Sequence, residues 1–167
     1  MSPIRLHPII IASPFVLAVL WALLPAHDQV TVIDGDTLIV KGQRIRLHGI
    51  DAPEREQVSL NANGAPYSCG QVAAARLRKE IKSSTVGCVA LYHDVYRRQV
   101  ATCTVGSKDL GDVMVRSGWA LDFSLYSNGK YLAAETEARN AKRGLWAGEF
   151  DEPRRWRLEH PLPASRR

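Results

Sequence analysis

Residues 32–54 read VIDGDTLIVKGQRIRLHGIDAPE, and this stretch decides the fold. It contains two runs rich in β-branched and apolar residues, 37–40 and 44–50, separated by three residues that include Gly42. A glycine in so short a connection can adopt a positive φ, which favours a tight turn between antiparallel strands. The stretch therefore predicts a β-hairpin.

Asp36 and Asp51 lie at the outer ends of this predicted hairpin. Because the start of one antiparallel strand lies beside the end of the next, the two carboxylates are expected to be close together. Neighbouring carboxylates repel each other unless a cation lies between them, and carboxylates alone favour hard ions such as Ca²⁺ or Mg²⁺. A single histidine, His48, does not make a transition-metal site, so a structural role is favoured for it. Asp34-Gly35 by itself is typical of a turn.

Two parts of this stretch, DGDT at residues 34–37 and RLHGIDAPE at residues 46–54, together resemble the signature of the staphylococcal nuclease (thermonuclease) family. The resemblance extends from about residue 30 to residue 146. It implies an α+β fold with a five-stranded OB-type β-barrel and three helices. It also implies Ca²⁺-dependent cleavage of DNA and RNA.

The resemblance assigns a role to each matching residue of the hairpin. Asp36 and Asp51 are the implied calcium carboxylates, and the main-chain carbonyl of Ala52 is a further implied ligand. Glu54 is expected to act on the attacking water, and Arg46 is expected to hold the phosphate.

Residues 93–101, HDVYRRQVA, resemble the D-x-Y-G-R-x-x-A segment of the same family. The match makes Arg98 the second catalytic arginine. The chain has Arg97 where the family usually has glycine, and an arginine forced to a positive φ costs about 1 kcal/mol. Arg97 therefore stays open as the alternative phosphate ligand. Tyr96 is expected to contact the nucleotide, with a plain turn aromatic as the alternative, and Tyr126 is the expected base-stacking residue.

Residues 85–92 and 99–105 are predicted to be two further strands that pair about the turn at residues 95 and 96. This pairing sets Cys88 opposite Cys103, with both sulfurs on one face at a separation that a disulfide can span. In an exported protein the pair is expected to be oxidised. Cys69 is left over, and the sequence allows it to be free, buried or paired with another molecule.

Hydrophobic periodicity and helix-stop signals predict three helices. They cover residues 68–82, 109–116 and 130–143. The first begins with Ser68 and Gln71, the S-x-x-Q pattern of a capping box. Residues 55–67 are predicted to be a long surface loop beside the site. Trp146 is predicted to pack in the core.

Residues 1–26 have the layout of a secretory signal peptide, with Arg5 ahead of an apolar run over residues 9–24. An uncleaved membrane anchor is the alternative, because the run approaches the roughly 17 residues that span a bilayer. Both interpretations place the protein outside the cytoplasm, and cleavage makes it secreted or periplasmic. Residues 27–148 are then the nuclease-like domain, and residues 149–167 are a basic, proline-containing tail that is mobile or solvated.

The formal net charge of the 167-residue chain is +5, which suits an anionic partner but does not by itself identify one. We expect a monomeric nuclease with no protein partner, which touches a membrane only if the amino-terminal segment is an uncleaved anchor. The resemblance also implies products that carry a 3′-phosphate.

The first alternative function is a catalytically weak or inactive nucleic-acid-binding OB-fold module. The second is an envelope protein that Ca²⁺ only stabilises. Retention of the complete acidic and basic set favours the enzyme.

Overall fold

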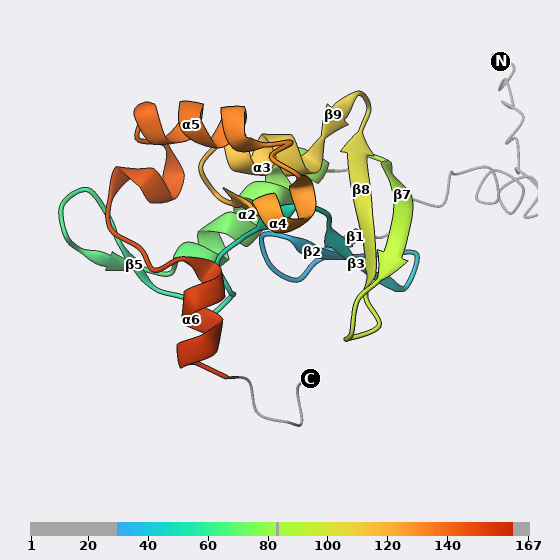
Figure 1. The fold of residues 1–167 in the computed structure, drawn as a ribbon, viewed down its shortest axis with the longest axis horizontal. Coiled ribbons are helices and arrows are strands. Elements are labelled where there is room, and N and C mark those ends of the chain that lie inside the picture. Colours follow the sequence, from blue (N-terminus) through green and yellow to red (C-terminus); the bar gives the residue numbers. More distant parts are fainter. Residues whose placement is uncertain (1–29, 83, 162–167) are drawn as a thin grey trace, which may run out of the picture.

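The computed structural model of the chain describes residues 30–82 and 84–161 (Figure 1). The predicted signal or anchor segment at residues 1–26 lies outside the described residues, as does the end of the predicted tail, residues 162–167. The described part combines a β-sheet with several helices, so the α+β class is confirmed. Neither described range contains a helix that is long and apolar enough to cross a membrane.

The main sheet is a path of five strands in the order β1-β2-β3-β8-β7, and a sixth strand, β9, pairs with β8. Their bounds are β1 (Val30–Val32), β2 (Thr37–Val40), β3 (Gln43–Leu47), β7 (Val86–His93), β8 (Gln99–Val105) and β9 (Lys108–Asp109). The β3–β8 pair is parallel, and the other pairs are antiparallel. Within the described residues β1 and β7 do not pair, so the five strands form an open sheet and not the expected OB-type barrel.

The β2–β3 hairpin is the one predicted, with Thr37 opposite Arg46. Its connection consists of Lys41 and Gly42, whose φ values of 51° and 80° give a turn that matches the twist of the strands. The second predicted strand is interrupted, because β3 ends at Leu47 and Gly49 turns the chain with a φ of 75°.

The chain after this turn forms β4 (Ile50–Asp51), which pairs with β10 (Leu121–Asp122) in a separate two-stranded sheet. The predicted loop at residues 55–67 also contains paired backbone, because β5 (Ser59–Leu60) and β6 (Pro66–Tyr67) form a small hairpin. That loop is therefore only partly irregular.

Five α-helices and one 3₁₀ helix lie in the described residues, two α-helices more than predicted. They are α2 (Cys69–Ile81), α3 (Leu110–Arg116), α4 (Ser124–Ser127), α5 (Leu132–Asn140), α6 (Pro153–Glu159) and η1 (Gly144–Ala147). The predicted helices correspond to α2, α3 and α5. The additional segments are four to seven residues long, too short to show a helical period in the sequence. Ser68 precedes α2, but its side chain makes no capping hydrogen bond, so the predicted capping box does not form.

The core lies between the main sheet and the helices α2, α3 and α5. Its fully buried large side chains include Leu38, Leu47, Ile50, Leu77, Leu110 and Met114. Trp146 was predicted to join them, but it is only half-buried, and Arg139 places its guanidinium 4.3 Å from the centre of the indole ring. Leu145 is the buried residue of η1 instead.

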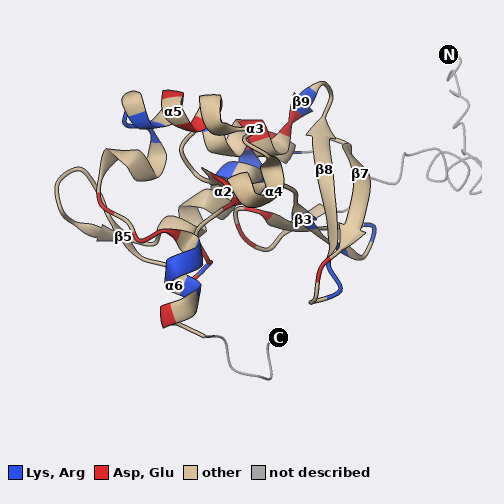
Figure 2. Cartoon of the chain, viewed as in Figure 1, with Lys and Arg blue, Asp and Glu red and all other residues tan. Residues whose placement is uncertain are grey.

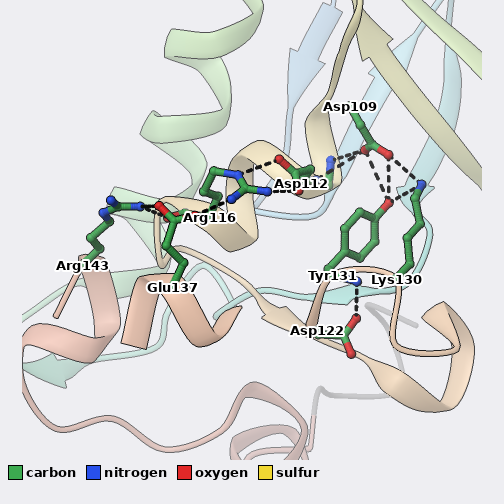
Figure 3. A network of polar contacts seen from close by, with 9 residues as sticks. Asp109, Asp112, Arg116, Asp122, Lys130, Tyr131, Glu137 and Arg143 are labelled. Atoms are coloured by element: carbon green, nitrogen blue, oxygen red, sulfur yellow. Dashed lines mark hydrogen bonds and ion pairs between the residues drawn. The ribbon is translucent and has the colours of Figure 1, made fainter. Parts of the chain in front are cut away.

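Polar contacts fix the positions of α3 and α5 relative to each other (Figure 3). Asp109 caps α3 and also accepts a hydrogen bond of 2.7 Å from Lys130 Nζ and one of 3.1 Å from the hydroxyl of Tyr131. On the outer surface Arg116 reaches from α3 to Glu137 on α5. The contact of Asp109 with the buried Tyr131 is expected to stabilise the packing of α3 against α5 more than the exposed ion pair does.

The register of β7 and β8 is the predicted one, with Cys88 opposite Cys103, Val86 opposite Val105 and Ala90 opposite Ala101. The two cysteines form a disulfide, as predicted. Cys69 is buried and free, which settles the alternatives left open by the sequence.

Replacing both disulfide cysteines by alanine is expected to lower the free energy of unfolding by about 3 kcal/mol, because the crosslink closes a loop of 15 residues. Urea denaturation measures this difference. Wild-type protein under reducing conditions is the control and should unfold at the same urea concentration as the double variant. Equal stability of the oxidised wild type and the variant would contradict the prediction.

Candidate active site

The site is a cluster of four carboxylates that come from two short segments. Asp34 and Asp36 precede β2, Asp51 ends β4, and Glu54 follows it. Asp36 and Asp51 expose only 3% and 5% of their surface. The Nη2 atom of Arg46 lies 3.1 Å from Asp36 Oδ2 and 3.0 Å from Asp51 Oδ1. The two aspartates are thus as close as the hairpin predicted, and a guanidinium lies between them.

Two glycines allow the segments to approach so closely. A Cβ atom on Gly35 would lie 2.6 Å from the Cβ of Ala52, and one on Gly70 would lie 1.7 Å from the carbonyl oxygen of Glu54. The first glycine is therefore required for close packing behind the carboxylates. The second lets the start of α2 support the loop that carries Glu54.

Asp36 is the carboxylate that the protein holds in its charged form. The Thr37 hydroxyl donates to it at 2.9 Å, and the backbone N–H of Ala52 donates at 3.2 Å. Burial raises the pKa of Asp36, but Arg46 and these two donors outweigh burial and hold that pKa below its usual value. Ala52 is thereby fixed beside both aspartates.

The other three carboxyl groups have raised pKa values. Burial raises the pKa of Asp34 to about 8, with further repulsion from Asp36 and Glu54. Burial and the charge of Asp36 also raise the pKa of Asp51 and that of Glu54. Burial and repulsion from neighbouring carboxylates thus disfavour the charged forms of these three carboxyl groups. Added positive charge would relieve this repulsion.

The cluster fits a hard divalent cation in its chemistry, because its donors are carboxylate and carbonyl oxygens. As arranged, no group of three or more His, Cys, Asp or Glu residues in the described ranges could hold a metal ion. The guanidinium groups of Arg46 and Arg157 donate to the oxygens of Asp51. A metal ion at Asp51 would compete with them.

Arg157 is a member of the cluster that the sequence did not predict. Its Nη2 donates to Asp51 Oδ1 at 2.9 Å and to Oδ2 at 3.1 Å, and its Nη1 donates to Glu54 Oε1 at 3.0 Å. Figure 2 shows basic residues along α6 beside an acidic stretch of the chain. Residues 153–159 of the predicted tail form a helix and not a mobile extension, although most of its side chains are solvated. Pro153 at the first helical position was the available sequence signal.

The second predicted arginine, Arg98, lies in the turn between β7 and β8. Its Nε donates to Asp94 Oδ2 at 2.7 Å, and Asp94 Oδ1 accepts from the backbone N–H groups of Tyr96 and Arg98, each at 2.9 Å. Arg97 has a φ of 61°, so the turn keeps the glycine-like conformation with an arginine in it. The charge of Arg98 contributes to the lowered pKa of Asp36, whereas Arg97 is exposed. This placement favours Arg98 over Arg97 as the phosphate ligand.

The predicted nucleotide-binding tyrosines both expose at least half of their surface. The guanidinium carbon of Arg98 lies 5.4 Å from the ring centre of Tyr96, and Tyr126 packs edge-on against Phe123 at 4.8 Å. Both rings are therefore accessible to a flat ligand. His48 packs edge-on against another tyrosine, Tyr92, in keeping with the structural role expected for it.

Comparison with known proteins gives consistent matches. Residues 44–148 match the family described as staphylococcal nuclease homologue. The chain is 36% identical over 143 residues to the succinoglycan biosynthesis protein ExoI of Rhizobium meliloti (strain 1021), over 79% of this chain and 75% of that protein. It is 32% identical over 144 residues to an uncharacterized endonuclease of Escherichia coli O157:H7, over 80% of this chain and 88% of that protein.

A fungal relative is longer than this chain. The probable endonuclease lcl3 of Sclerotinia sclerotiorum (strain ATCC 18683 / 1980 / Ss-1) is 30% identical over 159 residues, which are 87% of this chain and 58% of that protein. The chain thus spans little more than half of this relative.

Replacing Gly70 by alanine is expected to lower the free energy of unfolding by about 2 kcal/mol, because the new methyl group collides with the backbone of Glu54. Chemical denaturation measures the effect. Gly87→Ala is the matched control, since its Cβ would meet only the Thr104 hydroxyl at 3.8 Å. If the two variants were equally stable, the close packing of α2 against the Glu54 loop would not contribute to the free energy of unfolding.

Proposed function

This chain belongs to the staphylococcal nuclease homologue family and is a hydrolase of the nuclease class, and we propose that it is a Ca²⁺-dependent endonuclease that cleaves both DNA and RNA. We further propose that its products carry a 3′-phosphate and a free 5′-hydroxyl. The observation that carries this proposal is the cluster of Asp36, Asp51 and Glu54 with arginines that contact it or act on it electrostatically.

Arg46 and Arg98, the two arginines of the family motifs, would bind the phosphate of the substrate. Arg46 lies between the aspartates, and Arg98 is held by Asp94 at the edge of the same cluster. A guanidinium offers planar N–H donors that match phosphate oxygens. Two of them from separate elements can hold one phosphodiester from two sides and stabilise the negative charge that increases during attack.

The metal site would be formed by Asp36, Asp51 and the carbonyl of Ala52. When bound there, Ca²⁺ would neutralise part of the phosphate charge and orient the substrate. The repulsion among the buried carboxylates supports this assignment, because a divalent ion would lower it.

Glu54 is suited to accept a proton from the attacking water. Burial and the charge of Asp36 raise its pKa, which makes its carboxylate a stronger base than an exposed glutamate. The water oxygen forms a bond to phosphorus, and the bond from phosphorus to the 5′ oxygen breaks. The 5′ oxygen takes up a proton, and the phosphate stays on the 3′ side.

The exposed tyrosines are proposed to contact the nucleotide. Tyr96 and Tyr126 can each stack on a base, with about 1 to 3 kcal/mol per contact. Such contacts add affinity for single strands of either sugar type, which suits action on both DNA and RNA.

We propose that the protein works outside the cytoplasm, either secreted or periplasmic, or held there by an uncleaved amino-terminal anchor. The Cys88–Cys103 disulfide supports an oxidising compartment. We also propose that it acts as a monomer without a protein partner and that it meets a membrane only through such an anchor.

The proposed activity is tested by release of acid-soluble nucleotides from denatured DNA and from RNA, with Ca²⁺ and with EGTA. Glu54→Gln is expected to lower the cleavage rate at least about 100-fold, because the base is lost. Glu56→Gln is the matched control, since Glu56 is exposed on the same loop and should leave the rate unchanged.

The same assay tests whether Arg98 or Arg97 binds the phosphate. Arg98→Gln is expected to lower the rate by about 100-fold or more, whereas Arg97→Gln at the exposed neighbouring position should have little effect. The reverse order would assign the phosphate to Arg97. A folded wild-type protein that binds single strands but cleaves neither substrate would show the non-catalytic binding module instead.

A further inference from the structure

Arg157 occupies Asp51, one of the two carboxylates at which the proposed metal ion would bind, and pairs with the neighbouring Glu54. Asp51 accepts two hydrogen bonds from Arg157 and one from Arg46, so both of its oxygens are occupied. Glu54 accepts the third bond from Arg157 at Oε1. A cation entering this space would meet the guanidinium charge at contact distance, where repulsion is strong. Arg157 and a metal ion therefore exclude each other at Asp51.

The two arginines of the cluster differ in how easily they can move. Arg46 belongs to β3 in the main sheet and exposes only 16% of its side chain. Arg157 belongs to a seven-residue helix near the end of the described chain and exposes 32% of its side chain. Arg157 is therefore the arginine that can leave at lower cost.

Helix α6 is attached to the site at its base. Gln57 is fully buried, donates from Nε2 to the carbonyl oxygen of Asp151 at 2.7 Å and accepts at Oε1 from the N–H of Glu54 at 3.3 Å. Pro153 is buried beside this contact at the start of the helix. The arginine lies about one helical turn beyond Pro153, so its guanidinium can leave Asp51 while the base of α6 keeps its contact with Gln57.

We propose that Arg157 is the internal counter-cation of the metal site: it neutralises Asp51 and Glu54 in the metal-free protein and withdraws when a divalent cation binds. The inference rests on the proposed function in one respect, the assignment of Asp51 as a metal ligand. Arg157 thereby lowers the affinity for Ca²⁺ and holds Glu54 in an ion pair while the metal is absent. Metal binding and release of the base are coupled through one side chain.

The test is calorimetric titration of the full chain with Ca²⁺ in the absence of nucleic acid. Arg157→Gln is expected to tighten Ca²⁺ binding by about five- to tenfold, the effect of removing a partly exposed ion pair. Arg155→Gln is the matched control, because Arg155 lies on the same helix but pairs with the exposed Glu159. That variant should bind Ca²⁺ as the wild type does. Circular dichroism verifies that each variant is folded.

Hydrogen exchange gives a second measurement on the wild type. Ca²⁺ is expected to speed amide exchange in residues 153–159, because Arg157 leaves its carboxylates. Unchanged or weaker Ca²⁺ binding by Arg157→Gln, while the wild type binds Ca²⁺, would overturn the inference and leave the nuclease proposal standing. Failure of both proteins to bind Ca²⁺ would overturn the inference together with the proposed metal site.

Discussion

The burial of four neighbouring carboxyl groups is the constraint on which the rest of this site depends. Four acidic side chains, Asp34, Asp36, Asp51 and Glu54, lie where water cannot fully screen them, and three of them have raised pKa values. Uncompensated charges at such positions are costly, so positive groups must lie close by. The tight β2–β3 hairpin and the glycines behind it bring the carboxylates together. Packing at these glycines thus keeps the carboxylates close together although their charges repel one another.

Three arginines from separate elements balance this charge, and their mobility differs. Arg46 is fixed in the main sheet between two aspartates, and Arg98 is held in the β7–β8 turn by Asp94. Arg157 reaches the cluster from a short terminal helix. Under the proposed function, Arg157 would give way to a metal ion while Arg46 and Arg98 remain to bind the phosphate. The buried negative charge would then serve metal binding.

The sequence predicted those features that depend on neighbouring residues. The β2–β3 hairpin, the pairing of Cys88 with Cys103 and the three longer helices follow from turn chemistry, alternation and periodicity. The break after β3 was missed because Gly49 turns the chain inside an apolar run. Arg157 was missed because it is 103 residues from Glu54 and its helix has only one strong start signal, Pro153. The barrel was implied by family resemblance alone, and in the described residues β1 and β7 remain unpaired edges of an open sheet.

The central claim is that the carboxylate cluster is a cation site whose occupation stabilises the fold. The most direct test is the melting temperature of the wild type and of Asp51→Asn in EGTA and in increasing Ca²⁺. Because a ligand that binds only the native state stabilises it in proportion to the logarithm of its concentration, the wild-type melting temperature should rise with Ca²⁺. The rise should be absent or much smaller in Asp51→Asn. A wild-type melting temperature that is the same in EGTA and in excess Ca²⁺ would contradict the account.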